Sequence, residues 1–444
     1  MQKVGEETSF CDQKENLLLM AEHPRILSVN VSDASGGAAR AAYRIHKAVN
    51  KAGGNSRMLV KQKMLNDDSV ISIEEFDKKY FFTDACRFVE KKLKNQLQHR
   101  RWNRYPDRED VFLSDLRSES IHGAFQKINF DILHLHWINL HFLDLRELRK
   151  IHKPVVWTLH DCWPFTGICH YFYECTRYTS QCGNCPFLHS GKEKDLSREV
   201  WQKKKQFYQN VNLHIVSPSR WLADAARASS LLGNFPITVI PNPIDIQLFS
   251  PGNREQACQL LKLNPEKKYI LFGAMNALKD NRKGFKEFIL AIQYFEKKFV
   301  EQETELIIFG ASKELEKPDI KMPLHFYDVL PDEMLIAIYR VADVMVVPSL
   351  SENLSNVIME SLSCGTPVVA FDTGGNADLI DHQKNGYLAA PFSAEELAFG
   401  IHWCIQNNQD NNLSVHARQK VANNFSEEKV AQQYLSLYQA IIPK

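Results

Sequence analysis

Residues 25–38 read Arg-Ile-Leu-Ser-Val-Asn-Val-Ser-Asp-Ala-Ser-Gly-Gly-Ala, and an alanine-rich run with helical spacing follows as far as Val49. This order predicts a short apolar strand, a turn at Gly36 and Gly37, and a helix. The same alternation recurs along the chain and predicts a parallel sheet with helices on both faces. The further strands expected in this first series are 56–60, 132–135, 155–159 and 214–218.

The alternation is interrupted by the two prolines of Ile240-Pro-Asn-Pro-Ile-Asp245. Prolines that flank one residue stiffen the chain and are typical of a connection between domains. The strands expected in the second series are 269–272, 305–309, 324–327, 344–348 and 367–371. We therefore predict a leader over residues 1–23, a first domain over 24–240, a second domain over 241–425, and a helix over 426–444 that packs back on the first domain.

The composition is that of an ordinary globular protein, with 44% hydrophobic and 24% charged residues in a chain of 444. It excludes a collagen, a coiled coil and a disordered tail. No apolar run approaches the roughly 18 residues that span a bilayer, and residues 17–20 are too short for the core of a signal peptide. These features predict a cytoplasmic protein.

Charge is distributed unevenly along the chain. Residues 1–240 hold 35 Lys and Arg against 27 Asp and Glu, whereas the remainder holds 19 against 26. A basic first half suits a phosphate-rich ligand or an anionic membrane surface. The alternative is that the imbalance only attracts the two halves to each other.

Two glutamates spaced by seven residues, Glu352 and Glu360, lie where a predicted strand gives way to a helix. The helix is expected to open at residues 354–356, and its free amides and positive dipole end would attract a phosphate. Glu360 could then reach the hydroxyls of a ribose. For an isolated pair of this kind, a capped surface helix with two solvated glutamates is the simpler interpretation.

The residues around this pair resemble the donor-site signature of retaining nucleotide-sugar glycosyltransferases of family GT4. The resemblance runs from about residue 25 to the C-terminus and implies the GT-B fold, an α/β fold with two Rossmann-like doubly wound domains that face a central cleft. Residues 157–170 resemble a subgroup that builds bacterial exopolysaccharide and capsule, of the colanic-acid type. The segments that agree in order are Gly36-Gly37, Thr158-Leu-His160-Asp161, Ile240-Pro-Asn-Pro-Ile-Asp245, Asn281-Arg-Lys283-Gly-Phe, Tyr339-Arg-Val-Ala-Asp343, and 364–380 after the glutamates.

The resemblance implies a role for individual residues. Glu352 would contact the donor sugar and Glu360 the ribose. Lys283 would neutralise the diphosphate, whose charge grows as the glycosidic bond breaks. His160 would lie near the transferred sugar, so the implied catalytic residues are His160, Lys283 and Glu352. The other implied donor-binding residues are Gly36, Gly37, Val329 beside the base, Leu354, Ser355 and Asn356.

One position departs from the family pattern. The family usually places an arginine shortly after the strand equivalent to 269–272, but this chain reads Gly-Ala-Met-Asn over 273–276. Arg282 is near enough to act as this second clamp on the diphosphate, and the alternative is a solvent-facing arginine. The implied mechanism is transfer with retention at the anomeric carbon. No Asp-x-Asp pair appears, so no metal cofactor is expected to be required for catalysis.

Four cysteines, Cys169, Cys175, Cys182 and Cys185, lie close together in the sequence and end in a C-x2-C pair. The spacing predicts a structural zinc site, and Gly183 would permit its tight turn. Reduced cysteines without a ligand, a pair of disulfides and an iron–sulfur cluster are the alternatives.

Residues 87–108 combine basic with apolar side chains, as in an amphipathic helix that lies on an anionic membrane. A lipid-linked acceptor would explain such a contact, and a solvated helix face is the alternative. No motif for nucleic-acid binding accompanies the charge. His134 and His136 alternate along a strand, so both would point to one face. A strand-end position near an acceptor pocket, or a hydrogen bond in the core, is favoured over a metal pair.

Together these features predict a retaining glycosyltransferase in polysaccharide biosynthesis, cytoplasmic or peripheral on the inner face of the membrane. It would move a sugar from a UDP- or GDP-linked nucleotide-diphospho-sugar to a glycan or lipid-linked acceptor. The alternatives are a sugar-nucleotide epimerase of the same architecture and a non-catalytic scaffold in a polysaccharide-assembly complex. The two glutamates argue against the epimerase. A scaffold has no need of Lys283, Glu352, Glu360 and His160 together.

Overall fold

The computed structural model describes residues 23–77, 101–109, 111–116, 121–273, 280–299, 303–310, 319–328 and 330–443. Several sequence predictions lie outside these ranges. They are the leader up to residue 22, residues 87–100 of the basic stretch, Val329, and residues 274–276.

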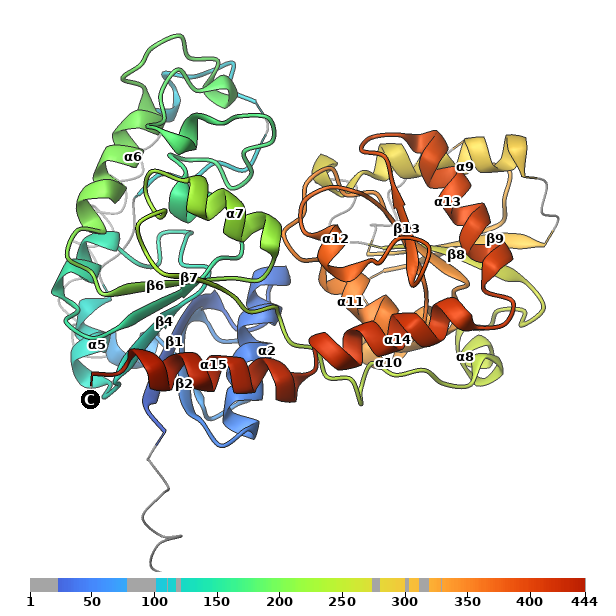
Figure 1. Ribbon diagram of the computed structural model, residues 1–444, viewed down its shortest axis with the longest axis horizontal. Helices are drawn as coiled ribbons and strands as arrows, with labels where there is room; N and C mark the ends of the chain where they lie inside the picture. Colours follow the sequence, from blue (N-terminus) through green and yellow to red (C-terminus); the bar gives the residue numbers. More distant parts are fainter. Residues whose placement is uncertain are drawn as a thin grey trace, which may run out of the picture.

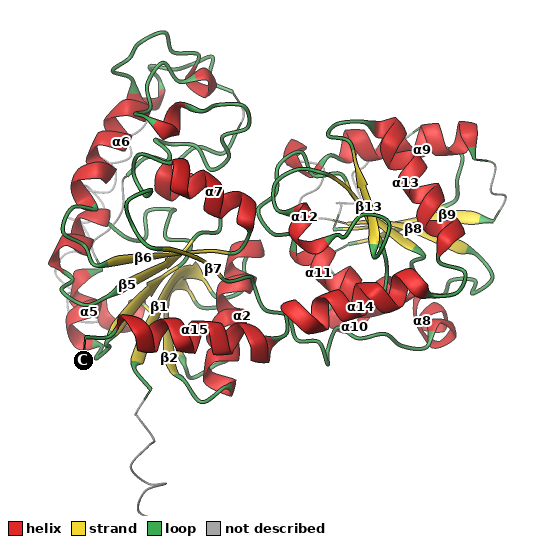
Figure 2. Cartoon of the chain, in the orientation of Figure 1, coloured by secondary structure: helices red, strands yellow, loops and turns green. Residues whose placement is uncertain are grey.

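The first domain is built on one parallel sheet of seven strands in the order β3-β2-β1-β4-β5-β6-β7. Its central strands are buried along their whole length, because helices cover both faces of the sheet (Figure 2). The strands are β1 Arg25–Ser32, β2 Asn55–Gln62, β3 Val70–Ser72, β4 Ile132–Leu135, β5 Val155–Thr158, β6 Leu213–Ser217 and β7 Ile237–Val239. The α-helices are α2 Gly37–Lys51, α3 Glu74–Asp77, α5 His122–Lys127, α6 Leu196–Phe207 and α7 Arg220–Ala228, and the short 3-10 helices are η1 Leu145–Lys150, η2 Trp163–Phe165, η3 Arg177–Thr179 and η4 Pro186–Leu188.

The second domain repeats this architecture with a parallel sheet of six strands in the order β10-β9-β8-β11-β12-β13. The strands are β8 Lys268–Gly273, β9 Thr304–Phe309, β10 Leu324–Tyr327, β11 Val344–Val347, β12 Val368–Phe371 and β13 Gly386–Ala389. The helices are α8 Arg254–Leu261, η5 Asn281–Lys283, α9 Phe285–Lys298, α10 Asp332–Val341, α11 Asn356–Ser363, α12 Asn376–Leu379, α13 Ala394–Asn407 and α14 Asn412–Asn424. In both sheets the strand order reverses beside the first strand, which confirms the prediction of two doubly wound domains.

The last helix, α15 Glu427–Ile441, lies along the first domain beside α2 (Figure 1). Its residues Val430, Tyr434 and Tyr438 are buried in one cluster with Ile26 and Ile132 of the first sheet. The C-terminal helix is therefore part of the core of the first domain.

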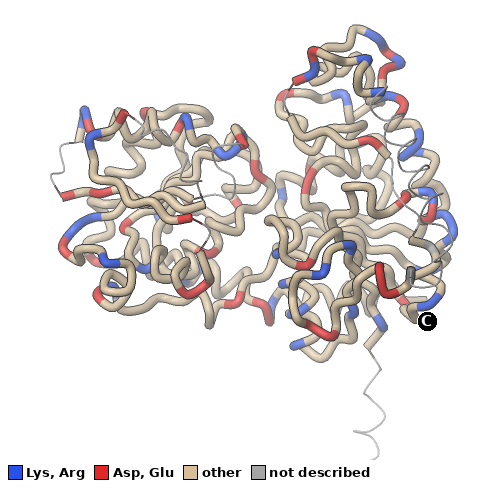
Figure 3. Tube along the Cα trace, turned by 180° about the vertical axis from the view of Figure 1, so that it is seen from behind, with Lys and Arg blue, Asp and Glu red and all other residues tan. Residues whose placement is uncertain are grey.

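The chain crosses between the domains twice, once after β7 and once before α15 (Figure 1). The two crossings lie side by side, because the amide of Ile244 donates to the carbonyl of Phe425 at 2.9 Å and a parallel bridge joins Ile244 to Ser426. Acidic and basic residues both occur on each domain (Figure 3). Within the described ranges, no helix is both long enough and apolar enough to cross a membrane.

Candidate active site between the two domains

Two basic side chains of the second domain, those of Lys283 and Arg282, meet at the carboxylate of Glu352. The Nζ of Lys283 lies 2.7 Å from Oε2 of Glu352, and Nη1 of Arg282 lies 3.2 Å from the same oxygen. Glu352 is only 9% exposed, and burial alone would raise its pKa. The positive charges of Lys283 and Arg282 outweigh burial and lower the pKa of Glu352 to about 2. Glu352 is therefore ionised at physiological pH.

The backbone around this carboxylate is fixed by two close approaches that require glycine. Gly284 ends η5 with a φ of 71°, and a Cβ there would lie 1.9 Å from the carbonyl oxygen of Pro348. Gly375 donates its amide to the carbonyl of Glu352 at 3.0 Å, and a Cβ there would lie 1.8 Å from the carbonyl oxygen of Asn353. Both sides of the ion pair are thus held on tightly packed backbone.

The guanidinium of Arg282 is enclosed by protein groups. It donates to the carbonyl of Ser351 at 3.0 Å and to the carboxylate of Asp280 at 2.8 Å. It also lies 4.5 Å from the ring centre of Tyr171, which comes from the first domain. Its side chain is 13% exposed, so the alternative of a solvent-facing arginine is wrong. A role in binding the diphosphate stays a prediction.

Glu360 forms an ion pair across the domain boundary that the sequence analysis did not anticipate. Its Oε1 accepts from Nη2 of Arg44 at 2.6 Å, and its Oε2 accepts from the hydroxyl of Tyr339 at 3.0 Å. Arg44 belongs to α2 of the first domain, and Glu360 is only 2% exposed. One signal was available: Arg44 follows Gly37 by seven residues, two helical turns, and so shares its face of α2.

The helix after Glu352 begins at Asn356, so Leu354 and Ser355 precede it as buried residues. Ser355 occupies the N-cap position without a side-chain cap hydrogen bond. The Nδ2 of Asn356 donates to the carbonyl of Gly37 at 3.2 Å, next to Gly36 with its φ of 92°. The structure therefore brings the glycine turn of the first domain to the start of α11 in the second.

His160 follows β5 at the carboxyl end of the first sheet. The side-chain Nδ2 of Asn353 donates to the carbonyls of Leu159 and His160 at 3.2 and 3.3 Å, which ties this strand end to the loop of Glu352. The Nε2 of His160 is hydrogen-bonded to Nδ1 of His136 at 3.1 Å. Burial lowers the pKa of His160 to about 4, so its imidazole is neutral at pH 7.

His134 and His136 do point to one face of β4, with their ring centres 4.1 Å apart. His134 is hydrogen-bonded at 2.8 Å to the hydroxyls of Thr158 and of Tyr438 in α15. The prediction of hydrogen-bonded core histidines is confirmed for His134.

The four clustered cysteines lie in the loop region after β5. Among the described residues, no group of three or more His, Cys, Asp or Glu side chains is arranged to hold a metal ion. Cys169, Cys175, Cys182 and Cys185 are all unpaired thiols. Burial raises the pKa of Cys182 and of Cys185 as long as no ligand is bound. The structure does not form the disulfides of the alternative, and the structural zinc site stays a prediction.

Comparison with known proteins places these residues in context. The model of the family Glycosyltransferase Family 4 matches residues 35–248, and that of Glycosyl transferases group 1 matches residues 256–424. A D-inositol 3-phosphate glycosyltransferase from Corynebacterium jeikeium is 27% identical over 59% of this chain and 60% of its own length. The putative colanic acid biosynthesis glycosyl transferase WcaC from Escherichia coli is 25% identical over 58% of this chain and 62% of its own length. The chain thus spans about three fifths of the length of these relatives.

Among solved structures, Anabaena HepE in complex with UDP-glucose superposes with a TM-score of 0.62. The match covers 94% of this chain and 100% of that one at 17% identity. This likeness shows a shared fold, the two-domain GT-B fold.

Proposed function

Because the chain belongs to glycosyltransferase family 4, we propose that it is a retaining glycosyltransferase of polysaccharide biosynthesis. It takes a sugar from a nucleotide-diphospho-sugar and transfers it to a glycan or lipid-linked acceptor. The observation that supports the proposal is the pair of salt bridges from Lys283 and Arg282 to Glu352, which we call the charged junction. It lies just before the start of α11.

The junction supplies what a diphosphate leaving group requires. Lys283 and Arg282 bring two positive charges to one buried glutamate, and the uncapped start of α11 presents backbone amides with the positive end of the helix dipole. These groups stabilise the negative charge that grows on the diphosphate as the glycosidic bond breaks. The proposed mechanism draws its positive charge from the protein and requires no metal ion.

Glu352, ionised and fixed in place, is suited to accept hydrogen bonds from the hydroxyls of the donor sugar. His160 is neutral, and since its Nε2 faces His136, its Nδ1 is the atom left for a ligand. No covalent intermediate with the protein is needed, because positioning and electrostatics carry the rate.

Glu360 would bind the ribose, and the ribose would compete for its carboxylate with Arg44 of the first domain. Both of its oxygens already accept hydrogen bonds, from Arg44 and Tyr339. A ribose hydroxyl that donates to Oε1 would share or displace the guanidinium of Arg44. Donor binding at α11 is therefore transmitted to α2 of the first domain.

The relatives support a more specific proposal for the substrates. The donor is expected to be UDP- or GDP-linked, and HepE is an example of the same fold in complex with UDP-glucose. The name of WcaC supports an acceptor from polysaccharide assembly. A cytoplasmic protein with peripheral contact to an anionic membrane is part of the proposal.

A thermal-shift screen of the full chain tests the donor site. UDP, GDP, ADP and their sugar derivatives are added in turn, because a ligand that binds the folded state stabilises it by about 2.7 kcal/mol at a hundred times its Kd. We expect one nucleotide family to raise Tm, and Lys283→Met to reduce the shift. With the donor so identified, NMR of the product should show the anomeric configuration of the donor. No shift with any nucleotide, or conversion of the donor without an acceptor, would overturn the proposal.

A further inference from the structure

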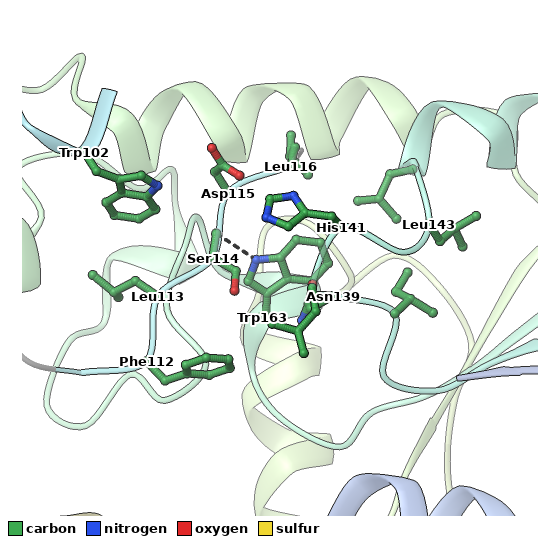
Figure 4. A pocket seen from close by; sticks show the side chains of 13 residues that line it. Trp102, Phe112, Leu113, Ser114, Asp115, Leu116, Asn139, His141, Leu143 and Trp163 are labelled. Carbon is green, nitrogen blue, oxygen red and sulfur yellow. Dashed lines mark hydrogen bonds between the residues drawn. The ribbon is translucent and has the colours of Figure 1, made fainter. Parts of the chain in front are cut away.

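A pocket in the first domain, apart from the charged junction, has a volume of about 150 Å³ (Figure 4). An internal cavity of about this size can hold one six-membered ring. Three aromatic side chains line it, Trp102, Phe112 and Trp163, together with the polar side chains of Asn139 and His141. Figure 4 shows Trp163 in the middle, with Trp102 and Phe112 to its left and His141 just above its indole ring.

The pocket lies at the same edge of the sheet as His160. Residues 138–145 follow β4, and Trp163 follows β5 just after His160. Asp161 joins the two places, because its carboxylate accepts from the indole of Trp137 at 2.7 Å and from the amide of Trp163 at 2.9 Å. The carboxyl ends of the strands thus hold both the candidate catalytic histidine and the wall of the pocket.

The wall of the pocket is held rigidly by buried polar groups. The indole of Trp163 donates to the carbonyl of Ser114 at 3.0 Å, and Nζ of the fully buried Lys204 lies 3.6 Å from the centre of the Trp163 ring. The hydroxyl of Ser114 is hydrogen-bonded to Nε2 of His170 at 2.9 Å, and Nδ1 of His170 to Asp161 at 2.6 Å. A satisfied buried network of this kind fixes side chains in one arrangement.

The loop that follows β4 carries backbone strain at the pocket. Leu140 and His141 have φ angles of 51° and 61°, although neither is glycine. Strain of this kind gathers at ligand-binding sites. Two apolar side chains of the lining, Leu140 and Phe112, are 52% and 49% exposed.

We propose that this pocket binds a pyranose ring of the acceptor glycan, an inference that rests on the proposed function. A pyranose has an apolar C–H face and hydroxyls around its edge. Trp102 and Phe112 offer partly exposed rings for the face, whereas Trp163 is buried against Lys204. Asn139 and His141 offer polar groups for the edge. Asp115 pairs with Arg101, and no lysine or arginine is among the described residues that line the pocket.

Saturation-transfer NMR with methyl glycosides tests the pocket directly. The probes are the methyl pyranosides of glucose, galactose, mannose, fucose and N-acetylglucosamine, with an n-alkyl phosphate in parallel. At least one glycoside should receive saturation from the wild-type protein. Its affinity should fall about tenfold in Trp102→Leu, because a stacking surface is lost, and also fall in Asn139→Ala.

The controls separate this inference from the proposed function. Trp403→Phe, a change in α13 of the second domain, should leave glycoside binding unchanged. The nucleotide-induced thermal shift should survive in Trp102→Leu, which shows that this variant is folded and that its donor site is intact. The inference is overturned if no glycoside binds the wild type, if both pocket variants bind as well as Trp403→Phe, or if only the alkyl phosphate binds. A wild type that binds glycosides but no nucleotide would instead contradict the proposed function.

Discussion

The replacement Glu352→Gln removes one charge from the junction with Lys283 and Arg282 while keeping the size of the side chain. The pKa of Glu352 is about 2, against 4.5 for an unperturbed glutamate. The difference of about 2.5 pH units, at ~1.4 kcal/mol for each, makes the ionised carboxylate worth about 3 kcal/mol to the free energy of unfolding at pH 7. Because Glu352 is 9% exposed, solvent screening removes little of this value.

The pH dependence has a definite sign. A carboxyl group whose pKa is lowered by folding stabilises the protein above its unfolded pKa of 4.5, and the contribution is lost as pH falls through about 2. The free energy of unfolding of the wild type should therefore exceed that of the variant by about 3 kcal/mol at pH 7 and by about 2 kcal/mol at pH 3.5.

Urea denaturation followed by circular dichroism measures this difference. The matched control is Glu395→Gln, because Glu395 pairs with Lys298 on the surface, where the two side chains are 59% and 50% exposed. An exposed pair of this kind is worth about 0–1 kcal/mol. The reasoning is refuted if Glu352→Gln costs no more than Glu395→Gln, or if its cost does not shrink in acid.

Two further predictions concern the backbone and the buried histidines. Gly284→Ala should lower the free energy of unfolding by about 2 kcal/mol or more, because its φ is 71° and the new Cβ would clash with Pro348. Gly123→Ala is the control for the same urea measurement, because a Cβ there meets no neighbouring atom. Equal stability of the two variants would contradict the expectation. His134 and His160 have pKa values lowered by burial to about 3 and about 4, so only the unfolded chain binds their protons near pH 5. Stability should therefore fall as pH drops below 6.5, by about 3 kcal/mol per pH unit around pH 5 for the two groups, and a stability that stays level from pH 7 to pH 5 in urea titrations would argue against this assignment.

The central strands were predictable from the sequence, but several edge strands were not. Strands β4 and β5 are largely apolar, and their predicted ranges agree with the observed Ile132–Leu135 and Val155–Thr158 to within one residue. The missed strands β3, β7 and β13 all lie at the edge of a sheet and are three or four residues long. Such short segments have weak intrinsic preference and become strands through the partner on which they pair.

The candidate site was predictable where residues lie close in sequence, and missed where the fold brings distant residues together. The period of a strand was enough to place His134 and His136 on one face. The pair Arg44–Glu360 joins helices of different domains. The spacing from Gly37 could place Arg44 on the right face of its helix, but it could not identify Glu360 as the partner. The cysteine spacing permits four thiols to meet, yet spacing alone does not determine whether they converge. In the structure Cys169 and Cys185 share one apolar cluster, and Cys175 packs against it.

The paired crossings between the domains limit how the molecule can move. A single flexible linker allows two domains to rotate about three axes. Two neighbouring linkers that are joined by a hydrogen bond leave one axis of easy rotation. The bond between Ile244 and Phe425 creates that second case. Opening and closing would then follow one repeatable arc, and each closure would return Arg44 to Glu360 in the same register.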